Sequence, residues 1–527
     1  MVFHGISAGV CPSALFCISK RLGQSKGLMT KTFYQSVIIR IFSIFLTTLS
    51  HSVQIVKFPE QQEKKEKSVR KFSRIKICTV HSLGINEPFR RLTMGGDRAL
   101  EPEGLETTIA QKFKGQKFDA SGNWVSRYDP LDPNAPELPT KGQIKAVIPK
   151  HCFQRSYFWS MFYLARDTVV AAAFVYATSL VLSPEIPSDF RMIPLWALGW
   201  GFYAFWMGSI VTGHWVLAHE CGHGAFSPSQ SFNDVVGFIV HQALLVPYFA
   251  WQYTHAKHHR RINHLTEGES HVPSTGTENG LGENNERESF YAVLHEAMGD
   301  GAFAGFQVWT HLFIGWPLYL LGLASTGRLT YSGEPLDGAI ADHFRPNSPM
   351  FPPKVSRKIF LSTVGVIVTL AGLIYLKWKV GVMPVLCWYW GPYTFSNGWL
   401  VLYTWLQHTD PSVPQYGEGE WSWVKGTLST IDRPYGIFDI LHHTIGSTHV
   451  THHLFHELPW YNADEATVHI KAFLEPKGLY NYDPTPWWKA MWRVAHTCHY
   501  VEDYRGIQYY KSLEDIPLST ETQKKKD

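Results

Sequence analysis

The chain has 527 residues, enough for roughly two or three soluble domains, but its composition indicates another class of protein. It is 14% aromatic and only 17% charged, whereas soluble domains are roughly 25% charged. Abundant Trp, Tyr and Phe with few charges are typical of a membrane protein, although a mean hydropathy of −0.13 requires a sizeable polar part. The net charge of +4 gives no indication of nucleic-acid binding. Seven scattered cysteines without a CxxC pair argue against a disulfide framework or a thiolate zinc site.

Residues 1–93 differ in character from the rest of the chain. An apolar stretch, Ser36–Val56, is interrupted by Arg40 and His51 and is followed by a basic run. Such a segment is consistent with a membrane anchor or an organelle-targeting sequence. The alternative is that it is not part of the working protein, because the polar stretch that begins at Met94 would make an ordinary amino terminus. We expect 1–93 to be a divergent, dispensable extension.

A polar lead-in at 94–160 is followed by apolar runs, which we compare with the ~20 residues needed to span a bilayer. The runs are Thr168–Ser183, Ile193–Leu217, Phe303–Ala324, Ile359–Leu376 and Val382–Leu406. Asp342–Lys358 and Thr409–Thr444 are polar connections, and 457–527 is a mixed, soluble-looking tail.

Three histidine clusters lie close to these runs: His219–His223 with HxxxH spacing, and His255–His259 and His449–His453 with HxxHH spacing. Residues at i, i+3 and i+4 share one face of a helix, so each cluster directs two or three ring nitrogens at one point. We therefore predict a metal site. Imidazole ligands suit zinc, copper, iron or nickel, so the spacing alone does not identify the metal.

A shared metal site constrains the topology, because all three clusters must lie on one side of the membrane. The chain between His259 and His449 must cross an even number of times, yet three apolar runs lie there. Phe303–Ala324 contains polar residues and a proline, so we expect it to lie along the interface. This predicts an all-α polytopic membrane protein with about four transmembrane helices in two hairpins. Basic residues beside the clusters and an acidic turn at Pro184–Arg191 favour a cytosolic location for the clusters, although Lys377 and Lys379 argue against it.

The first cluster also matches HExxH, the zinc metalloprotease motif in which the glutamate is a general base. A catalytic zinc has about four ligands, so this alternative leaves six clustered histidines unexplained. Eight or nine histidines suit two metals. Association with the bilayer indicates an apolar substrate, and attack on its unactivated C–H bonds requires a redox-active metal such as iron or copper.

From about Met94 to Tyr510, some four fifths of its length, the chain resembles the membrane-bound, histidine-box fatty acid desaturases. It looks most like the microsomal delta-12 (omega-6, oleate) desaturases of fungi and plants. The resembling stretches are IPKHCFQRS at 148–156, AHECGHGAFS at 218–227, the cluster at 255–259, QHTD at 407–410 and THVTHHLF at 448–455.

The resemblance implies a di-iron site in a cytosolic helical cap. The implied ligands are His219, His223, His255, His258, His259, His449, His452 and His453, with His408 as a ninth. The apolar runs and the shared side of the clusters predict a first hairpin at 161–217, a cytosolic or interfacial region at 218–358, a second hairpin at 359–407 and a cytosolic region at 408–527. In related acyl desaturases an Asn precedes the extra histidine by four residues and supports a bridging water. Here Thr404 occupies that position, and the resemblance does not extend to that water.

The activity implied is oxygen-dependent insertion of a cis double bond at delta-12 of an oleoyl chain, giving a linoleoyl lipid. Two Fe ions and O2 take part, and electrons come from NADH through a reductase and cytochrome b5. Lys524–Lys526 resembles a dilysine signal for the endoplasmic reticulum membrane. An omega-3 (delta-15) desaturase, a hydroxylase, an epoxygenase and an acetylenase remain alternatives, because they share the scaffold. The sequence leaves open acyl-CoA or phospholipid as substrate and the oligomeric state.

Several polar residues near the clusters have two interpretations. Glu220 either orients an imidazole or bonds only to backbone. Asp410, Glu457 and Asp464 have the same two interpretations, and we expect most of them to be solvated. His442 and His443 are expected to be spare by ligand count, and Cys221 to be a small packed residue.

Overall fold

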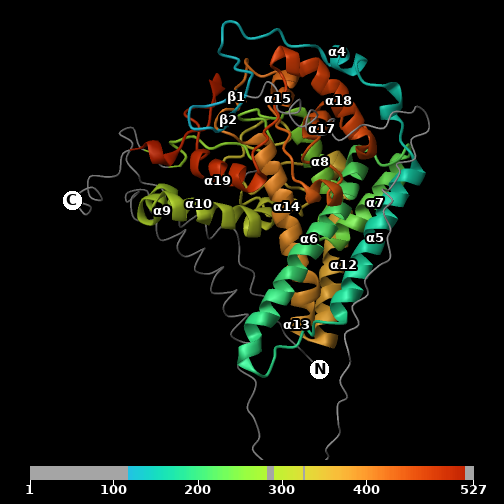
Figure 1. Cartoon of the computed structure of the whole chain (residues 1–527). Helices are drawn as coiled ribbons and strands as arrows, with labels where there is room; N and C mark the ends of the chain where they lie inside the picture. The colour runs from blue at the N-terminus through green and yellow to red at the C-terminus, as the bar shows by residue number, and fades with distance from the viewer. Residues whose placement is uncertain (1–116, 280, 282–289, 325–326, 517–527) are drawn as a thin grey trace, which may run out of the picture. The chain divides into compact units, whose positions relative to one another are not determined.

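The computed structural model describes residues 117–279, 281, 290–324 and 327–516; the extension at 1–93 and the lysines at 524–526 lie outside the described residues. The described chain is mostly helical, as predicted (Figure 1). Its longer helices are α5 (Tyr157–Ser179), α6 (Ile193–His223), α7 (Gln230–Ala243), α8 (Tyr248–Arg260), α9 (Phe290–Met298), α10 (Asp300–Trp309), α12 (Ser356–Val380), α14 (Gly391–His408), α18 (Ala463–Leu474) and α19 (Trp487–Thr497). The short helices are α4 (Lys141–Ala146), α11 (Gly315–Leu320), α13 (Val382–Val385), α15 (Trp423–Leu428), α16 (Ile437–Leu441) and α17 (His449–Leu454). Two small antiparallel sheets pair β1 (Lys117–Phe118) with β2 (Trp124–Val125) and β3 (Gln415–Tyr416) with β4 (Ile507–Gln508).

Two described helices are long and apolar enough to cross a membrane, namely Tyr157–Ser179 and Pro353–Val380, which contains α12. One comes from each of the two predicted hairpins. Both carry exposed apolar side chains, such as Tyr176 at 67% and Val368 at 64% exposure, as expected of a surface that faces lipid. Helices α6 and α14 do not meet the same requirement for length and hydropathy. The arrangement of four spans therefore stays a prediction.

Helices α6 and α14 pack side by side, and glycines allow their close approach. A Cβ added at Gly208 of α6 would lie 2.5 Å from the Cβ of Phe395 on α14. One added at Gly391, at the start of α14, would lie 3.0 Å from that of Ala204. Small residues at such contacts are what bring helices together within a bilayer. The two helices run in the same direction, so the first histidine cluster and His408 lie at neighbouring helix ends.

Helices α7 and α8 form a bent pair that was not predicted from the sequence. Taken together, the two helices are long and apolar enough to cross a membrane, but the chain bends by 107° between them. Such a pair is either a broken span or a re-entrant loop. Between them Leu245 has a φ of 55°, in the left-handed region, and Pro247 precedes α8. Neither arm reaches the ~20 residues that a straight span needs, so a search for long apolar runs passes over both. Helix α8 carries the second histidine cluster.

The run Phe303–Ala324 is not one continuous helix. It comprises most of α10, a π-helical turn at Thr310–Ile314, and α11, which contains Pro317. Figure 1 shows α10 lying across the direction of α6 and α12. This arrangement agrees with a segment that lies along the interface, which remains a prediction.

Cysteines introduced at Thr277 and Asn347, two exposed positions on either side of this run, are expected to be labelled from the same side of the membrane. The reason is that an interfacial run does not change sides. A membrane-impermeant thiol reagent applied to intact and to opened vesicles measures this, with the parent chain showing the background from its own cysteines. Labelling of the two positions from opposite faces would show that the run crosses.

The third histidine cluster lies on α17, in a core with α4, α15 and α18. Val450 and Leu454 of α17 pack there with Ile144 of α4 and Ile470 of α18, all nearly inaccessible to solvent. Helix α4 begins with a capping box between Thr140 and Gln143. These contacts fix the side of α17 that faces away from the other histidines.

Candidate metal centre

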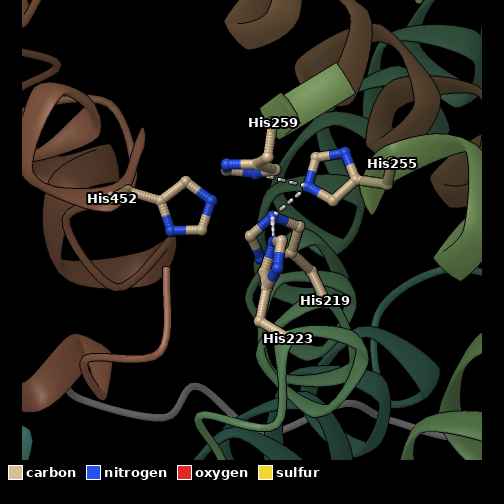
Figure 2. A group of neighbouring side chains, drawn as sticks. All are labelled: His219, His223, His255, His259 and His452. Atoms are coloured by element: carbon tan, nitrogen blue, oxygen red, sulfur yellow. Dashed lines mark hydrogen bonds between the residues drawn. The ribbon is translucent and has the colours of Figure 1, made fainter. Parts of the chain in front are cut away.

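Five histidines from three helices converge in one group (Figure 2). His219 and His223 lie at the carboxyl end of α6, His255 and His259 on α8, and His452 on α17. Each offers a ring nitrogen, and these nitrogens all lie within 4.8 Å of one another. The Nε2 atom of His219 is 2.8 Å from that of His255 and 3.2 Å from that of His223.

A second group lies beside the first. It contains His258 of α8, His408 at the end of α14 and His453 of α17. His449 joins it, because its Nε2 atom is 3.2 Å from that of His408 and 3.1 Å from that of His453. The rings of His259 and His453, one from each group, stack with centroids 4.2 Å apart. The structure thus brings together the eight box histidines and His408.

The spacing of the nitrogens fits ligands that share a metal ion. Two imidazole nitrogens each about 2.1 Å from a metal lie about 3.0 Å apart at a right angle and about 3.4 Å apart at the tetrahedral angle. The closest Nε2–Nε2 distances are 2.8 to 3.2 Å. Among the described residues, the buried Nε2 of His452 has no hydrogen-bond partner. The donor set therefore fits a metal ion.

The histidines of α17 are held in the neutral form that binds metals. Burial lowers the pKa of His449 to about 3. Burial, and then the neighbouring histidines, lower the pKa of His453 well below its usual value. A neutral imidazole keeps a free electron pair, so no proton has to leave before a metal binds.

Oxygen atoms hold the Nδ1 side of several rings while the Nε2 side faces the group. His219 Nδ1 is 3.1 Å from Glu220 Oε1, which also lies 3.8 Å from His452 Nδ1. His258 Nδ1 lies 3.0 Å from the Glu269 carbonyl oxygen. Such partners fix the tautomer and the orientation of a metal-binding ring. Of the two interpretations of Glu220, the structure supports the one in which it orients an imidazole.

Replacing Glu220 with Gln is expected to weaken metal binding about tenfold, the lower end of the range for such orienting partners. The amide oxygen still accepts a hydrogen bond from His219, as the carboxyl does. Burial raises the pKa of Glu220 well above its usual value, but a metal cation held by the rings favours the carboxylate, whose charge an amide cannot supply. Metal retained by the purified protein against a graded chelator measures the change. Glu137→Gln, at an exposed site in the segment before α4, is the control; equal retention in both variants would contradict the role of Glu220.

Neither group includes His442, His443, Cys221 or Asp410. His442 Nε2 is 2.9 Å from the Ser209 carbonyl oxygen, and His443 Nε2 is 2.7 Å from Asp167 Oδ2, so both are histidines with partners of their own. Cys221 is a fully buried packing residue, as expected. The expectation of a solvated position is wrong for Asp410. Its carboxylate is completely buried and paired with two arginines.

Two contacts beside the groups were not predicted. The ring of His456 lies 5.0 Å from that of His223 and 5.2 Å from that of His259, centroid to centroid. His456 lies beyond the end of α17 at Leu454, so helical spacing does not account for its place. Thr404 Oγ1 lies 3.0 Å from His271 Nε2, so the residue that replaces the Asn of related enzymes contacts another histidine.

The fold and the site together define a class of protein, namely helical membrane proteins in which histidines form two buried groups suited to metal binding. The model of the fatty acid desaturase family matches residues 194–484, and this chain belongs to that family.

Several curated proteins are similar over most of their length. The omega-6 fatty acid desaturase, endoplasmic reticulum, of Brassica juncea is 38% identical over 378 residues, 71% of this chain and 91% of that protein. The delta(12) fatty acid desaturase of Mortierella alpina is 38% identical over 384 residues, 71% of this chain and 91% of that protein. An oleoyl-12-hydroxylase of Ricinus communis is 38% identical over 368 residues, 70% of this chain and 88% of that protein. The predicted resemblance is confirmed.

Proposed function

We propose that this desaturase inserts the second cis double bond of an oleoyl lipid at delta-12, using two iron ions. The ions are held by His219, His223, His255, His258, His259, His408, His449, His452 and His453. The observation that carries the proposal is the convergence of all nine rings in two adjoining groups. The names of similar plant and fungal proteins support the position of the double bond.

The net reaction requires an external source of electrons. The –CH2–CH2– unit and O2, with two electrons and two protons, give –CH=CH– and two waters. The iron ions, when bound, supply the activation of O2 that the side chains cannot. Electrons are proposed to come from NADH through a reductase and cytochrome b5. The name of the Brassica relative supports a location in the endoplasmic reticulum membrane.

The protein contributes position and a dry environment. The box histidines are largely buried, with His219, His258, His259 and His453 each about 3% exposed, so bulk water is excluded from them. Glu220 and the Glu269 carbonyl hold two of the rings in fixed orientations. The ends of α6 and α14 join these groups to apolar helices, which allows an acyl chain to approach from the lipid.

The choice of carbon depends on the shape of the acyl site. Apolar contacts discriminate neighbouring methylenes by only ~1–3 kcal/mol, so the existing cis bond must locate the chain. A hydroxylase relative is as similar as the desaturases, so the scaffold alone does not separate these outcomes. A delta-15 (omega-3) desaturase is the second candidate.

The test is to express the full chain in a host without polyunsaturated fatty acids and to supply oleate and linoleate separately. Linoleate formed from oleate is the expected product, and a host with the His452→Ala variant is the control. Linolenate formed from linoleate, without linoleate from oleate, would replace the delta-12 assignment with delta-15. A 12-hydroxy product from oleate would assign a hydroxylase.

A further inference from the structure

Two consecutive residues, Asp432 and Arg433, lie between the helix that ends at His408 and the helix that begins at His449. Both side chains are completely buried. They belong to a loop that precedes the third histidine cluster by about 16 residues, and neither sits in a histidine box. Their contacts join the two sides of the second histidine group.

Asp432 holds the amino end of α17. Its Oδ1 atom accepts a hydrogen bond from the Val450 N–H at 2.8 Å, and the His449 N–H also points to this carboxylate. The Thr448 side chain, at the usual capping position, instead donates to the Thr444 carbonyl oxygen. Asp432 therefore caps the amino end of α17, although it is not adjacent to this helix in the sequence. The Tyr480 hydroxyl donates to its other oxygen.

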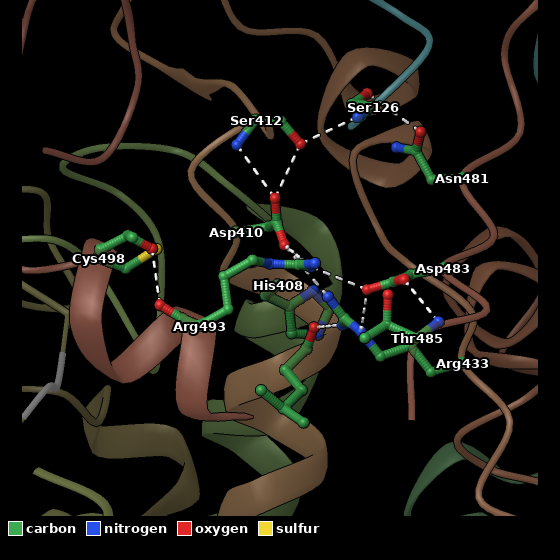
Figure 3. A network of polar contacts seen from close by, with 12 residues as sticks. Ser126, His408, Asp410, Ser412, Arg433, Asn481, Asp483, Thr485, Arg493 and Cys498 are labelled. Carbon is green, nitrogen blue, oxygen red and sulfur yellow. Dashed lines mark hydrogen bonds and ion pairs between the residues drawn. The ribbon is translucent and has the colours of Figure 1, made fainter. Parts of the chain in front are cut away.

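Arg433 holds the carboxyl end of α14. Its guanidinium donates to the Leu406 carbonyl oxygen, in the last turn of that helix, and pairs with Asp410 Oδ2 at 3.4 Å (Figure 3). On its other side, Nε donates to Asp483 Oδ2 at 3.0 Å. Arg493 completes the network by bonding both carboxylates. An arginine fork serves several acceptors at fixed angles, which a lysine cannot do.

The backbone around this dipeptide reinforces both attachments. The Ile431 N–H donates to the Gln407 carbonyl oxygen at 3.0 Å, and the Arg433 N–H donates to the Gly446 carbonyl oxygen at 3.1 Å. Gln407 Nε2 donates to that same Gly446 carbonyl at 2.6 Å. The segment is therefore bonded at once to the residue before His408 and to the turn before His449.

We propose that Asp432 and Arg433 are positioning residues that set the separation of His408 from His449, and with it the occupancy of the second metal position. The inference rests on the proposed two-metal function. The second group takes three of its four histidines, His408, His449 and His453, from the two helix ends that this dipeptide joins. The first group takes only His452 from α17 and keeps four histidines on α6 and α8. Loosening the dipeptide therefore affects mainly the second metal.

The experiment measures iron per chain in the purified full-length protein, for the wild type, Asp432→Ala and Asp432→Asn. Asn keeps a side-chain oxygen that can accept the Val450 N–H, whereas Ala has none. We expect about two irons in the wild type and in Asp432→Asn, and about one in Asp432→Ala. Asp119→Ala, which removes a carboxylate that accepts backbone N–H groups in a remote surface turn, is the control and should keep both.

Two irons in Asp432→Ala, or an equal loss in the Ala and Asn variants, would overturn the proposal. If Asp432→Ala does not give a folded protein, Arg433→Lys decides, since it keeps the charge but reaches fewer acceptors. Loss of iron in that variant supports the positioning role, and retention of both irons overturns it. A wild type without two irons would instead contradict the proposed function, so the two failures are distinguishable.

Discussion

Replacing either His258 or His452 with alanine is expected to abolish formation of the unsaturated product while the protein still inserts into membranes. Each change removes one imidazole from one of the two groups, His258 from the second and His452 from the first. Both metals are needed in the proposed reaction, so the loss of either should stop it. Fatty acid analysis of the expressing host measures product, and membrane fractionation measures insertion.

His469→Ala is the matched control for this pair, because His469 is an exposed histidine on α18. It should keep wild-type product levels. If His258→Ala or His452→Ala retained a substantial share of the activity, the residue concerned would not be a ligand and the grouping would need revision.

Replacing Asp483 with alanine is expected to destabilise the fold by about 3–5 kcal/mol, the usual consequence of leaving buried charges uncompensated. Asp483 Oδ2 accepts from Arg433 Nε at 3.0 Å and from Arg493 Nη2 at 2.9 Å, and its side chain is completely buried. Its loss leaves two arginines facing Asp410 alone. The temperature at which the detergent-solubilised protein loses its monodisperse elution peak reports the change.

The same residue gives the stability a dependence on pH. Burial alone would raise the pKa of Asp483, but Arg433 and Arg493 outweigh burial and hold it below its usual value. Its stabilisation is therefore present above the ordinary pKa of about 3.9 and is lost as pH falls through the lower folded pKa.

The control for Asp483→Ala is Asp503→Ala, which breaks an exposed pair with Arg505 and should leave the unfolding temperature unchanged. Equal effects of the two variants would contradict the role of the buried network.

The histidine groups were predictable because helical spacing is a local property. His219 and His223 are four residues apart on α6, and His255, His258 and His259 repeat at three and four on α8. Each set needs only its own helix to share a face. The candidate spans were predictable for the same reason, since length and hydropathy are read within one segment. That the groups meet was inferred from their number, and the structure brings them together.

The partners of these histidines were not predictable from local pattern. Asp410 looks like an ordinary loop aspartate in sequence, yet its partners Arg433 and Arg493 are 23 and 83 residues away. A pairing at such separation depends on the complete fold. His408 itself was identified only through the family resemblance, because a single histidine has no spacing to reveal it. The bent pair of α7 and α8 was missed because each arm is too short to resemble a span.

Elemental analysis of the purified wild-type protein tests most directly whether this chain holds two iron ions in an all-histidine site. The protein, expressed in an iron-supplied host and purified without chelator, should contain about two irons per chain and little zinc. Stoichiometric zinc without iron would contradict the account.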